Sequence, residues 1–233
     1  IYTGEDTLSL HDALPIFLSD VNVRKALSMA IDRQLLTEVG YGIAGKPTCN
    51  IVPAPEAWAS DNTECLTQDI EGAKKLLDEA GWVPGGDGIR EKDGKRLKLV
   101  FQTSVNAVRQ DFQALIKQWW QEIGVETELK VIDASVYFGG DAGSPDTFQK
   151  FYADIEMYAN FFEGANPEPS LAKNICSQSP GPDNQWQGEN TSRYCDPEYD
   201  KLVDQLGAIV DPAERGAMGK RMNDMVTKDS DAI

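Results

Sequence analysis

The sequence predicts an α/β fold in which a mixed sheet is flanked by helices. Residues 97–101 and 125–131 alternate apolar and polar side chains, which is typical of half-buried strands. Between them, residues 108–123 repeat apolar side chains at helical spacing and stop at Gly124. A strand, a helix and a second strand joined by short links form a right-handed crossover with parallel strands.

Residues 1–16 are not expected to be native protein. The decapeptide TLSLHDALPI at residues 7–16 is the translation of a nucleotide string that resembles a common sequencing adapter. Without this segment the formal net charge changes from −16 to −13, and His11, the only histidine, is lost. Zinc sites built on histidine and Ser-His or Cys-His catalysis are then excluded. The strong acidity opposes nucleic acid or an anionic membrane as a partner.

The first third of the chain predicts two helices and a hairpin. A helix within residues 17–40 begins at the N-cap Asp20. A second helix covers residues 69–80 and ends at Gly81. Residues 89–101 predict a hairpin with its turn at Asp93-Gly94. The apolar positions expected to face the core are Val23, Ala26, Leu27, Ala30, Ile31 and Leu35 in the first helix, and Ala73, Leu76, Leu77 and Ala80 in the second.

The core face of the central helix is expected to consist of Val108, Phe112, Leu115, Ile116, Trp119 and Ile123. Trp119 and its neighbour Trp120 are interpreted as packing residues rather than as a sugar-stacking platform. No apolar run approaches the roughly 20 residues of a membrane span.

The last third predicts two further helices, which start at Asp196-Pro197 and at Asp211-Pro212. Methionines of the second helix are expected to fill the core. Residues 139–146 form a loop whose acids lack the ligand spacing of an EF-hand. The chain ends at Ile233 directly after a helix, and we expect it to be a fragment of a longer protein.

The four cysteines form two local pairs, Cys49 with Cys65 and Cys176 with Cys195. Neither pair has the C-x-x-C spacing of zinc or thioredoxin-like redox sites. Their even number and loop-closing positions predict two disulfides, each worth about 3 kcal/mol in the chain-entropy model. Four buried thiols are the alternative. Disulfides would place the protein outside the cytosol.

A candidate ligand rim follows the short strand predicted at residues 153–158. The chain continues with an aromatic pair, an isolated carboxylate and the turn at residues 166–169. The loop between the second pair of cysteines is rich in Gly, Pro, Asn and Gln. A strand end, aromatic residues and a stapled loop are a usual arrangement of a ligand rim. An ordinary surface loop that needs a disulfide is the alternative interpretation.

Several phrases of the chain resemble the extracytoplasmic solute-binding proteins of peptide-type ABC importers, bacterial solute-binding protein family 5. They are DVNVRKALSMAIDRQLL, DIEGAKKLLDEAGW, EGANPE and RYCDPEYDKL, in the family's order, and the resemblance covers nearly all of residues 20–228. It implies that residues 17–233 are the second, C-terminal lobe of a two-lobed periplasmic-binding-protein-like fold of class II type, truncated at both ends. The bridge between Cys176 and Cys195 also matches one seen in this family.

The resemblance also implies a set of ligand-binding residues. In the family, the first acid of the EGANPE-like motif grips the free ammonium of a bound peptide, and Glu163 falls on that position. Asn160 stands where the dipeptide binders carry a tryptophan. The neighbouring aromatic residues expected at the ligand are Tyr158, Phe161 and Phe162. Arg193 is a candidate for an opposing carboxylate contact, with a structural ion pair to Glu189 or Asp196 as the alternative.

The expected function is therefore that of a monomeric receptor without cofactor or bound metal. It would bind a short peptide or a related small solute between two lobes and deliver it to the permease subunits of an ABC transporter. It would act in the periplasm or as a lipid-anchored protein at the cell surface. The alternative is a secreted, carboxylate-dependent hydrolase such as a glycoside hydrolase, with Glu163 paired with Glu168 or Asp154.

Overall fold

The computed structural model describes residues 17–160 and 166–229. The segment expected to be adapter-derived, residues 1–16, lies outside the described residues, as do Phe161, Phe162 and Glu163. Within the described ranges, none of the helices has the length and apolar character needed to cross a membrane.

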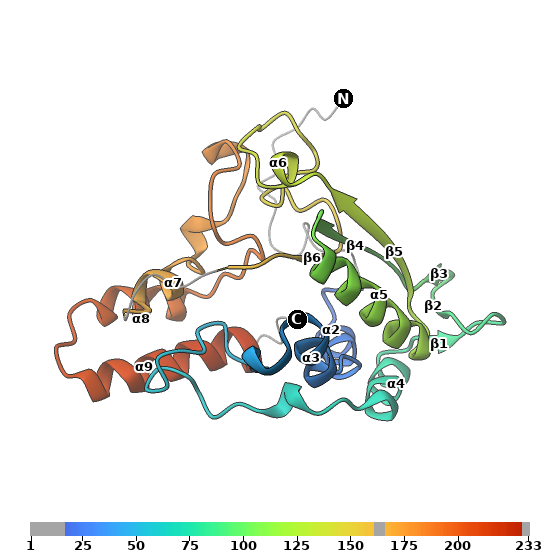
Figure 1. The fold of residues 1–233 in the computed structure, drawn as a ribbon, viewed down its shortest axis with the longest axis horizontal. Helices are drawn as coiled ribbons and strands as arrows, with labels where there is room; N and C mark the ends of the chain where they lie inside the picture. The colour runs from blue at the N-terminus through green and yellow to red at the C-terminus, as the bar shows by residue number, and fades with distance from the viewer. Residues whose placement is uncertain (1–16, 161–165, 230–233) are drawn as a thin grey trace.

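The centre of the fold is a three-stranded parallel sheet in the order β5-β4-β6. Strand β4 (Lys98–Ser104) pairs with β5 (Glu126–Ile132) along its whole length and with β6 (Ile155–Met157) over three residues. Helix α5 (Ala107–Glu122) connects β4 to β5. The predicted strand–helix–strand unit with parallel strands is confirmed, and Figure 1 shows α5 lying along β4 and β5.

A second, antiparallel sheet is built from three very short strands, β1 (Val83–Pro84), β2 (Arg90–Lys92) and β3 (Lys95–Arg96). The turn at Asp93-Gly94 has positive φ at both residues, as a tight hairpin turn requires. The predicted hairpin is therefore confirmed at its turn. It ends at Arg96, because β4 begins at Lys98 and pairs in the other sheet.

The helix predicted within residues 17–40 is two helices, α2 (Val21–Met29) and α3 (Arg33–Tyr41). Asp20 caps the first, and the Asp32 carboxylate accepts a hydrogen bond from the Leu35 backbone N–H and caps the second. The turn between them breaks the helical period, so Leu35 is 37% exposed rather than buried. The other five expected positions, Val23, Ala26, Leu27, Ala30 and Ile31, are buried.

The larger core lies between α2, α4 (Ile70–Glu79), α5 and the face of β4 that carries Leu99 and Phe101. Along α5 the buried positions are Gln113, Ile116 and Trp120. The predicted core stripe was thus one residue out of phase at its tryptophan, since each residue turns a helix by about 100°. Trp120 is fully buried, and its indole N–H donates to the Leu27 carbonyl at 3.0 Å. Trp119 packs partly buried against the same core, so both tryptophans serve packing.

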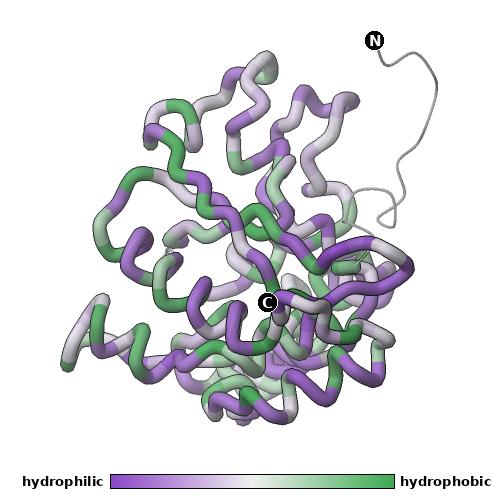
Figure 2. The backbone as a smooth tube through the Cα atoms, turned by 90° about the vertical axis from the view of Figure 1, so that its right-hand side faces the viewer, coloured by the Kyte–Doolittle hydropathy of each residue, from purple (hydrophilic) through white to green (hydrophobic). Residues whose placement is uncertain are grey.

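A second core joins α7 (Glu168–Ala172), α8 (Pro197–Leu206) and α9 (Pro212–Asp224). Asp196 and Asp211 cap α8 and α9 as predicted. Of the methionines at this end, Met222 and Met225 are buried in the core and Met218 packs against it, partly buried. Figure 1 shows α8 and α9 as a pair at one end of the molecule, away from the sheet, and in Figure 2 hydrophobic and hydrophilic colours alternate along the helices.

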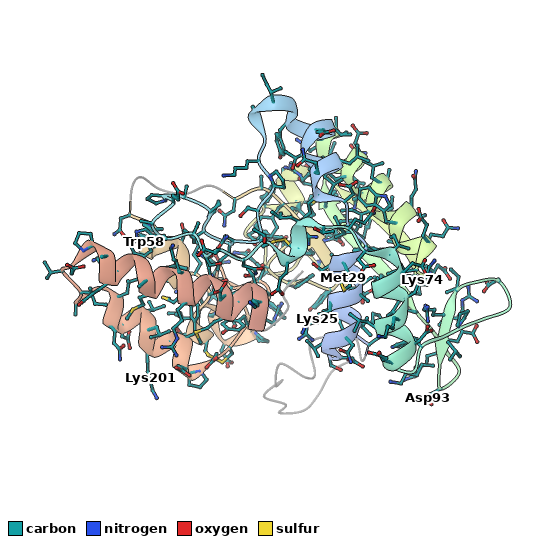
Figure 3. The ribbon with its side chains drawn as sticks, turned by 90° about the horizontal axis from the view of Figure 1, so that it is seen from below. Lys25, Met29, Trp58, Lys74, Asp93 and Lys201 are labelled. Carbon is teal, nitrogen blue, oxygen red and sulfur yellow. A yellow bond between two sulfur atoms is a disulfide. The ribbon has the colours of Figure 1, made fainter. Side chains whose placement is uncertain are left out.

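Residues 51–58 attach the first half of the chain to α9. The buried amide of Asn223 accepts from the Val52 N–H at 2.9 Å and donates to the carbonyls of Val52 and Trp58 at 3.1 and 3.0 Å. Gly219 permits the close approach, since a Cβ there would meet the Trp58 ring at 2.3 Å. Figure 3 shows Trp58 against this helical layer. One side chain thus joins segments 171 residues apart.

Two disulfides close loops on the surface of these cores. One joins Cys49 to Cys65 with the Cα atoms 5.8 Å apart, and the other joins Cys176 to Cys195 with the Cα atoms 4.5 Å apart. The first holds the segment that leads into residues 51–58, and the second holds the loop between α7 and α8.

Replacing Asn223 with alanine is expected to lower the free energy of unfolding by about 2–4 kcal/mol, because three buried backbone groups lose their partner. Urea denaturation measures the loss. The control is Lys201→Ala on the exposed surface of α8, which should change stability by no more than about 0.5 kcal/mol. Equal stability of the two variants would show that Asn223 does not hold residues 51–58.

Candidate functional site

The candidate site lies at the carboxyl edge of the parallel sheet. Because β4, β5 and β6 are parallel, their carboxyl ends meet at one edge, and ligands of open α/β sheets bind outside such an edge. Short helix α6 (Ala134–Tyr137) follows β5 there. In Figure 1 the strand arrows point toward α6 and the loops around it.

Polar residues occupy this end of β4, although the middle of the strand, Leu99 to Phe101, is apolar. Leu99 and Phe101 are followed by Gln102, Thr103 and Ser104, and all five are buried. The Thr103 hydroxyl donates to the Met157 carbonyl at 2.6 Å, which fastens β4 to β6 at the edge. The middle of β4 therefore packs in the hydrophobic core, and its carboxyl end is fixed by hydrogen bonds.

A half-buried carboxylate, Glu156, is the centre of this polar end. It stands opposite Gln102 in the β4–β6 register, and the Gln102 amide donates to its Oε1 at 3.1 Å. The Tyr137 hydroxyl donates to its Oε2 at 3.5 Å. Burial raises the pKa of Glu156 to about 8, although the nearby Arg193 charge and the Tyr137 hydrogen bond act in the opposite direction. Burial and the Glu156 charge also raise the pKa of Tyr137.

Four aromatic rings line the same region. The ring centroids of Tyr137 and Phe138 are 4.9 Å apart, and that of Phe148 lies 5.9 and 5.6 Å from them. The Tyr158 ring is tilted by 58° against that of Phe148, with the centroids 5.2 Å apart, and its hydroxyl shares a hydrogen bond with the Thr191 hydroxyl at 3.0 Å. Phe138 is 45% exposed, so this aromatic group presents an apolar surface to solvent at the carboxyl edge of the sheet.

Arg193, expected at the ligand, binds the backbone of neighbouring loops. Its guanidinium donates to the carbonyls of Thr191, Gln149 and Lys150 at 3.0–3.1 Å. The two acids considered as its alternative partners bind other groups. Glu189 pairs with Lys173 at 2.8 Å, and Asp196 accepts from the Glu198 N–H.

The structure places only part of the predicted site. Tyr158 is half-buried within the aromatic group, and Asn160 is exposed two residues later. The remaining predicted residues, Phe161, Phe162 and Glu163, follow directly on the same chain outside the described range. Within residues 17–160 and 166–229, no cluster of three or more His, Cys, Asp or Glu side chains could hold a metal ion.

Sequence reasoning missed Glu156, Gln102 and Tyr137. A signal was present, because Glu156 is a carboxylate inside an otherwise apolar strand and Gln102 to Ser104 are polar residues ending a buried one. The register that brings Gln102 and Glu156 together is a property of the sheet, which the linear pattern does not specify.

Two carboxylates of the hydrolase alternative have other partners. Asp154 accepts from the Val100 backbone N–H and so extends the β4–β6 pairing. Glu168 binds the Arg215 guanidinium at 2.7 Å.

Because the folded state holds a proton on Glu156 that the unfolded chain releases near its usual pKa of 4.5, this residue should make stability fall as pH rises from about 4.5 to about 8. Glu156→Gln should remove that part of the pH dependence. Urea unfolding at several pH values, compared with the exposed control Glu79→Gln, measures the difference. Parallel stability–pH curves for the two variants would contradict the assignment.

Comparison with known proteins identifies relatives of this arrangement. Residues 8–178 match the family model "Bacterial extracellular solute-binding proteins, family 5 Middle". The oligopeptide-binding protein AppA of Bacillus subtilis is 30% identical over 122 residues, which are 50% of this chain and 22% of AppA. The dipeptide-binding protein of Escherichia coli is 25% identical over 220 residues, which are 88% of this chain and 35% of the relative.

Solved structures show the same fold. The structure of Bacillus subtilis AppA in complex with a nonapeptide superposes with a TM-score of 0.74 at 23% identity, covering 92% of this chain and 41% of AppA. The chain thus spans less than half of the relatives it matches, and the expected α/β architecture of a periplasmic binding protein is confirmed for this part. Since the family model covers most of the chain, the protein belongs to family 5 of the bacterial extracellular solute-binding proteins.

Proposed function

We propose that the full-length protein is the substrate-binding component of an ABC importer for short peptides. The observation that carries this proposal is the carboxyl edge of the sheet, where the Glu156 cluster meets an aromatic group whose last member, Tyr158, precedes Glu163 by five residues in the chain. In a member of this family, such an edge is the surface to which a ligand is expected to bind. The matching relatives include oligopeptide- and dipeptide-binding proteins, which supports peptides as the ligand class.

Within this proposal the chain supplies one half of a site that closes between two lobes. Glu163 binds the ammonium of the peptide by a charge-assisted hydrogen bond, with Asn160, Phe161 and Phe162 beside it. Tyr158, wedged between Phe148 and Thr191, supports the start of this segment. Arg193 is the least supported of the expected ligand contacts, because three backbone carbonyls already accept from its guanidinium.

An extracytoplasmic location agrees with the family's description and with the two disulfides, which persist in oxidising compartments. Delivery of the peptide to permease subunits, action as a monomer, and a periplasmic or lipid-anchored position are part of the same proposal. The hydrolase alternative has less support, because the family is one of binding proteins and Asp154 and Glu168 serve structural bonds.

Neutralising Glu163 in the full-length protein (Glu163→Gln) is expected to weaken peptide binding by about 2–5 kcal/mol, since the ligand ammonium would be buried without a partner. Calorimetry with a free and an N-acetylated peptide measures the effect, and acetylation should add little to the loss in the variant. The control is the exposed Asp183→Asn, which should bind normally. Wild-type affinity of Glu163→Gln for the free peptide would refute the role of Glu163.

A further inference from the structure

An unusual lysine lies on the loop that leads into β6. The Lys150 Nζ stands over two aromatic rings, 5.3 Å from the centroid of Trp186 and 5.8 Å from that of Tyr152. The two rings meet edge to face, with their centroids 6.0 Å apart. The residue is 9% exposed. Within the described part of the chain, no carboxylate or hydrogen-bond acceptor is recorded at this ammonium, although the protein carries 38 acidic residues.

The surroundings of Lys150 leave its charge incompletely compensated. Removing an ammonium from water is costly unless it is paired and hydrogen-bonded. Two aromatic faces offset only part of that cost, since a cation–π contact is worth about 0.5–2 kcal/mol. The ammonium has three N–H donors that rings do not satisfy. An anion that binds here would accept hydrogen bonds from these N–H donors, next to aromatic rings that exclude water from one side of the ammonium.

The backbone around Lys150 is held in an unfavourable conformation. Five non-glycine residues of the described chain have positive φ, and apart from the hairpin residue Asp93 they all belong to this place. They are Phe151 (51°), Gln185 (57°), Trp186 (61°) and Arg193 (56°). Such conformations cost free energy, persist only when the surrounding structure fixes them, and gather at binding sites.

Arg193 is one of the groups that fix this conformation. Its guanidinium donates to the carbonyls of Gln149 and Lys150, and the Lys150 N–H donates to the Thr147 carbonyl. The loop that carries Trp186 and Arg193 is closed by the bridge between Cys176 and Cys195. The position of the ammonium is therefore determined by the fold and not by a mobile side chain alone.

Lys150 and the residues around it lie at the carboxyl edge of the sheet, where the ligand is proposed to bind. Phe148, two residues before Lys150, packs on Tyr158 and donates its N–H to the Tyr137 carbonyl, and the charge of Arg193 acts on Glu156 in the polar cluster. Thr191, two residues before Arg193, holds the Tyr158 hydroxyl. Figure 1 shows these loops beside α6, beyond the ends of the strands.

We propose that Lys150 is a specificity-determining residue that binds a carboxylate of the peptide ligand, and that Arg193 is the residue that positions it. The inference rests on the proposed peptide-binding function and adds to it a preference for ligands with a free carboxylate. That carboxylate is either the C-terminus of the peptide or an acidic side chain. Glu163 and Lys150 then recognise opposite charges of one ligand.

The test measures binding to the full-length protein by calorimetry with three matched peptides. They are a short peptide with a free C-terminus, its C-terminal amide, and an amide that carries one glutamate side chain. Wild-type protein is expected to bind the free acid about 10- to 100-fold more tightly than the neutral amide. Tight binding of the glutamate-containing amide would identify the side chain as the carboxylate, and weak binding would identify the C-terminus.

Lys150→Met keeps the length and apolar body of the side chain and removes its charge. It should bind the free acid and the neutral amide alike, with the affinity that the wild type shows for the amide. Lys150→Arg should retain part of the preference. Lys201→Met, on the exposed surface of α8, is the control and should behave as the wild type (Figure 3). Thermal unfolding of each variant checks that the fold is intact.

Three outcomes separate the two claims. If the wild type binds no peptide, the proposed function fails and this inference fails with it. If it binds acid and amide equally, the receptor function stands and the carboxylate site is refuted. If a folded Lys150→Met loses affinity for both peptides to the same extent, Lys150 supports the site without recognising a carboxylate, which also overturns the inference.

Discussion

The parallel pairing of β4 with both of its neighbours is the constraint on which the rest of the structure depends. Since a parallel pair needs a crossover, α5 must cover one face of β4, and Trp120 seals it against α2 through the Leu27 carbonyl. The same pairing brings all carboxyl ends to one edge. The core and the candidate site therefore lie along consecutive parts of one strand, with Phe101 at the change from apolar to polar side chains.

A polar end of a buried strand is stable only if its groups are satisfied. Glu156 meets this condition through Gln102 and Tyr137, and burial shifts its pKa so that the neutral form is favoured near neutral pH. Around Lys150 the condition is met less completely, because aromatic rings stand where a carboxylate would be expected. This contrast is the basis of the proposal that Lys150 is available to a ligand, whereas Glu156 completes the fold.

The loops at this edge are held from outside the sheet. Arg193 binds the carbonyls of the segment before β6, and the disulfide between Cys176 and Cys195 closes the loop from which Arg193 extends. Ile175 and Tyr194, at the two ends of that loop, pack against the second core, in which Asn223 joins residues 51–58 to α9. Arg193, predicted at the ligand, thus contacts the backbone of these loops, and the neighbouring Lys150 is the residue that we propose as a ligand contact.

The sequence by itself determined the strand–helix–strand unit, the caps at Asp20, Asp196 and Asp211, and the family, because periodicity, capping and motifs are local signals. It did not predict the break between two helices at Asp32, because the apolar pattern continues across that cap. It also chose Trp119 instead of Trp120 as the core tryptophan, because only packing shows which of two adjacent helical positions faces the core. The Gln102–Glu156 register and the ring contacts of Lys150 join residues that are distant in sequence. Only the tertiary structure determines these contacts, because strand pairing and loop packing bring the residues together. The order of residues along the chain does not specify which strands and loops meet.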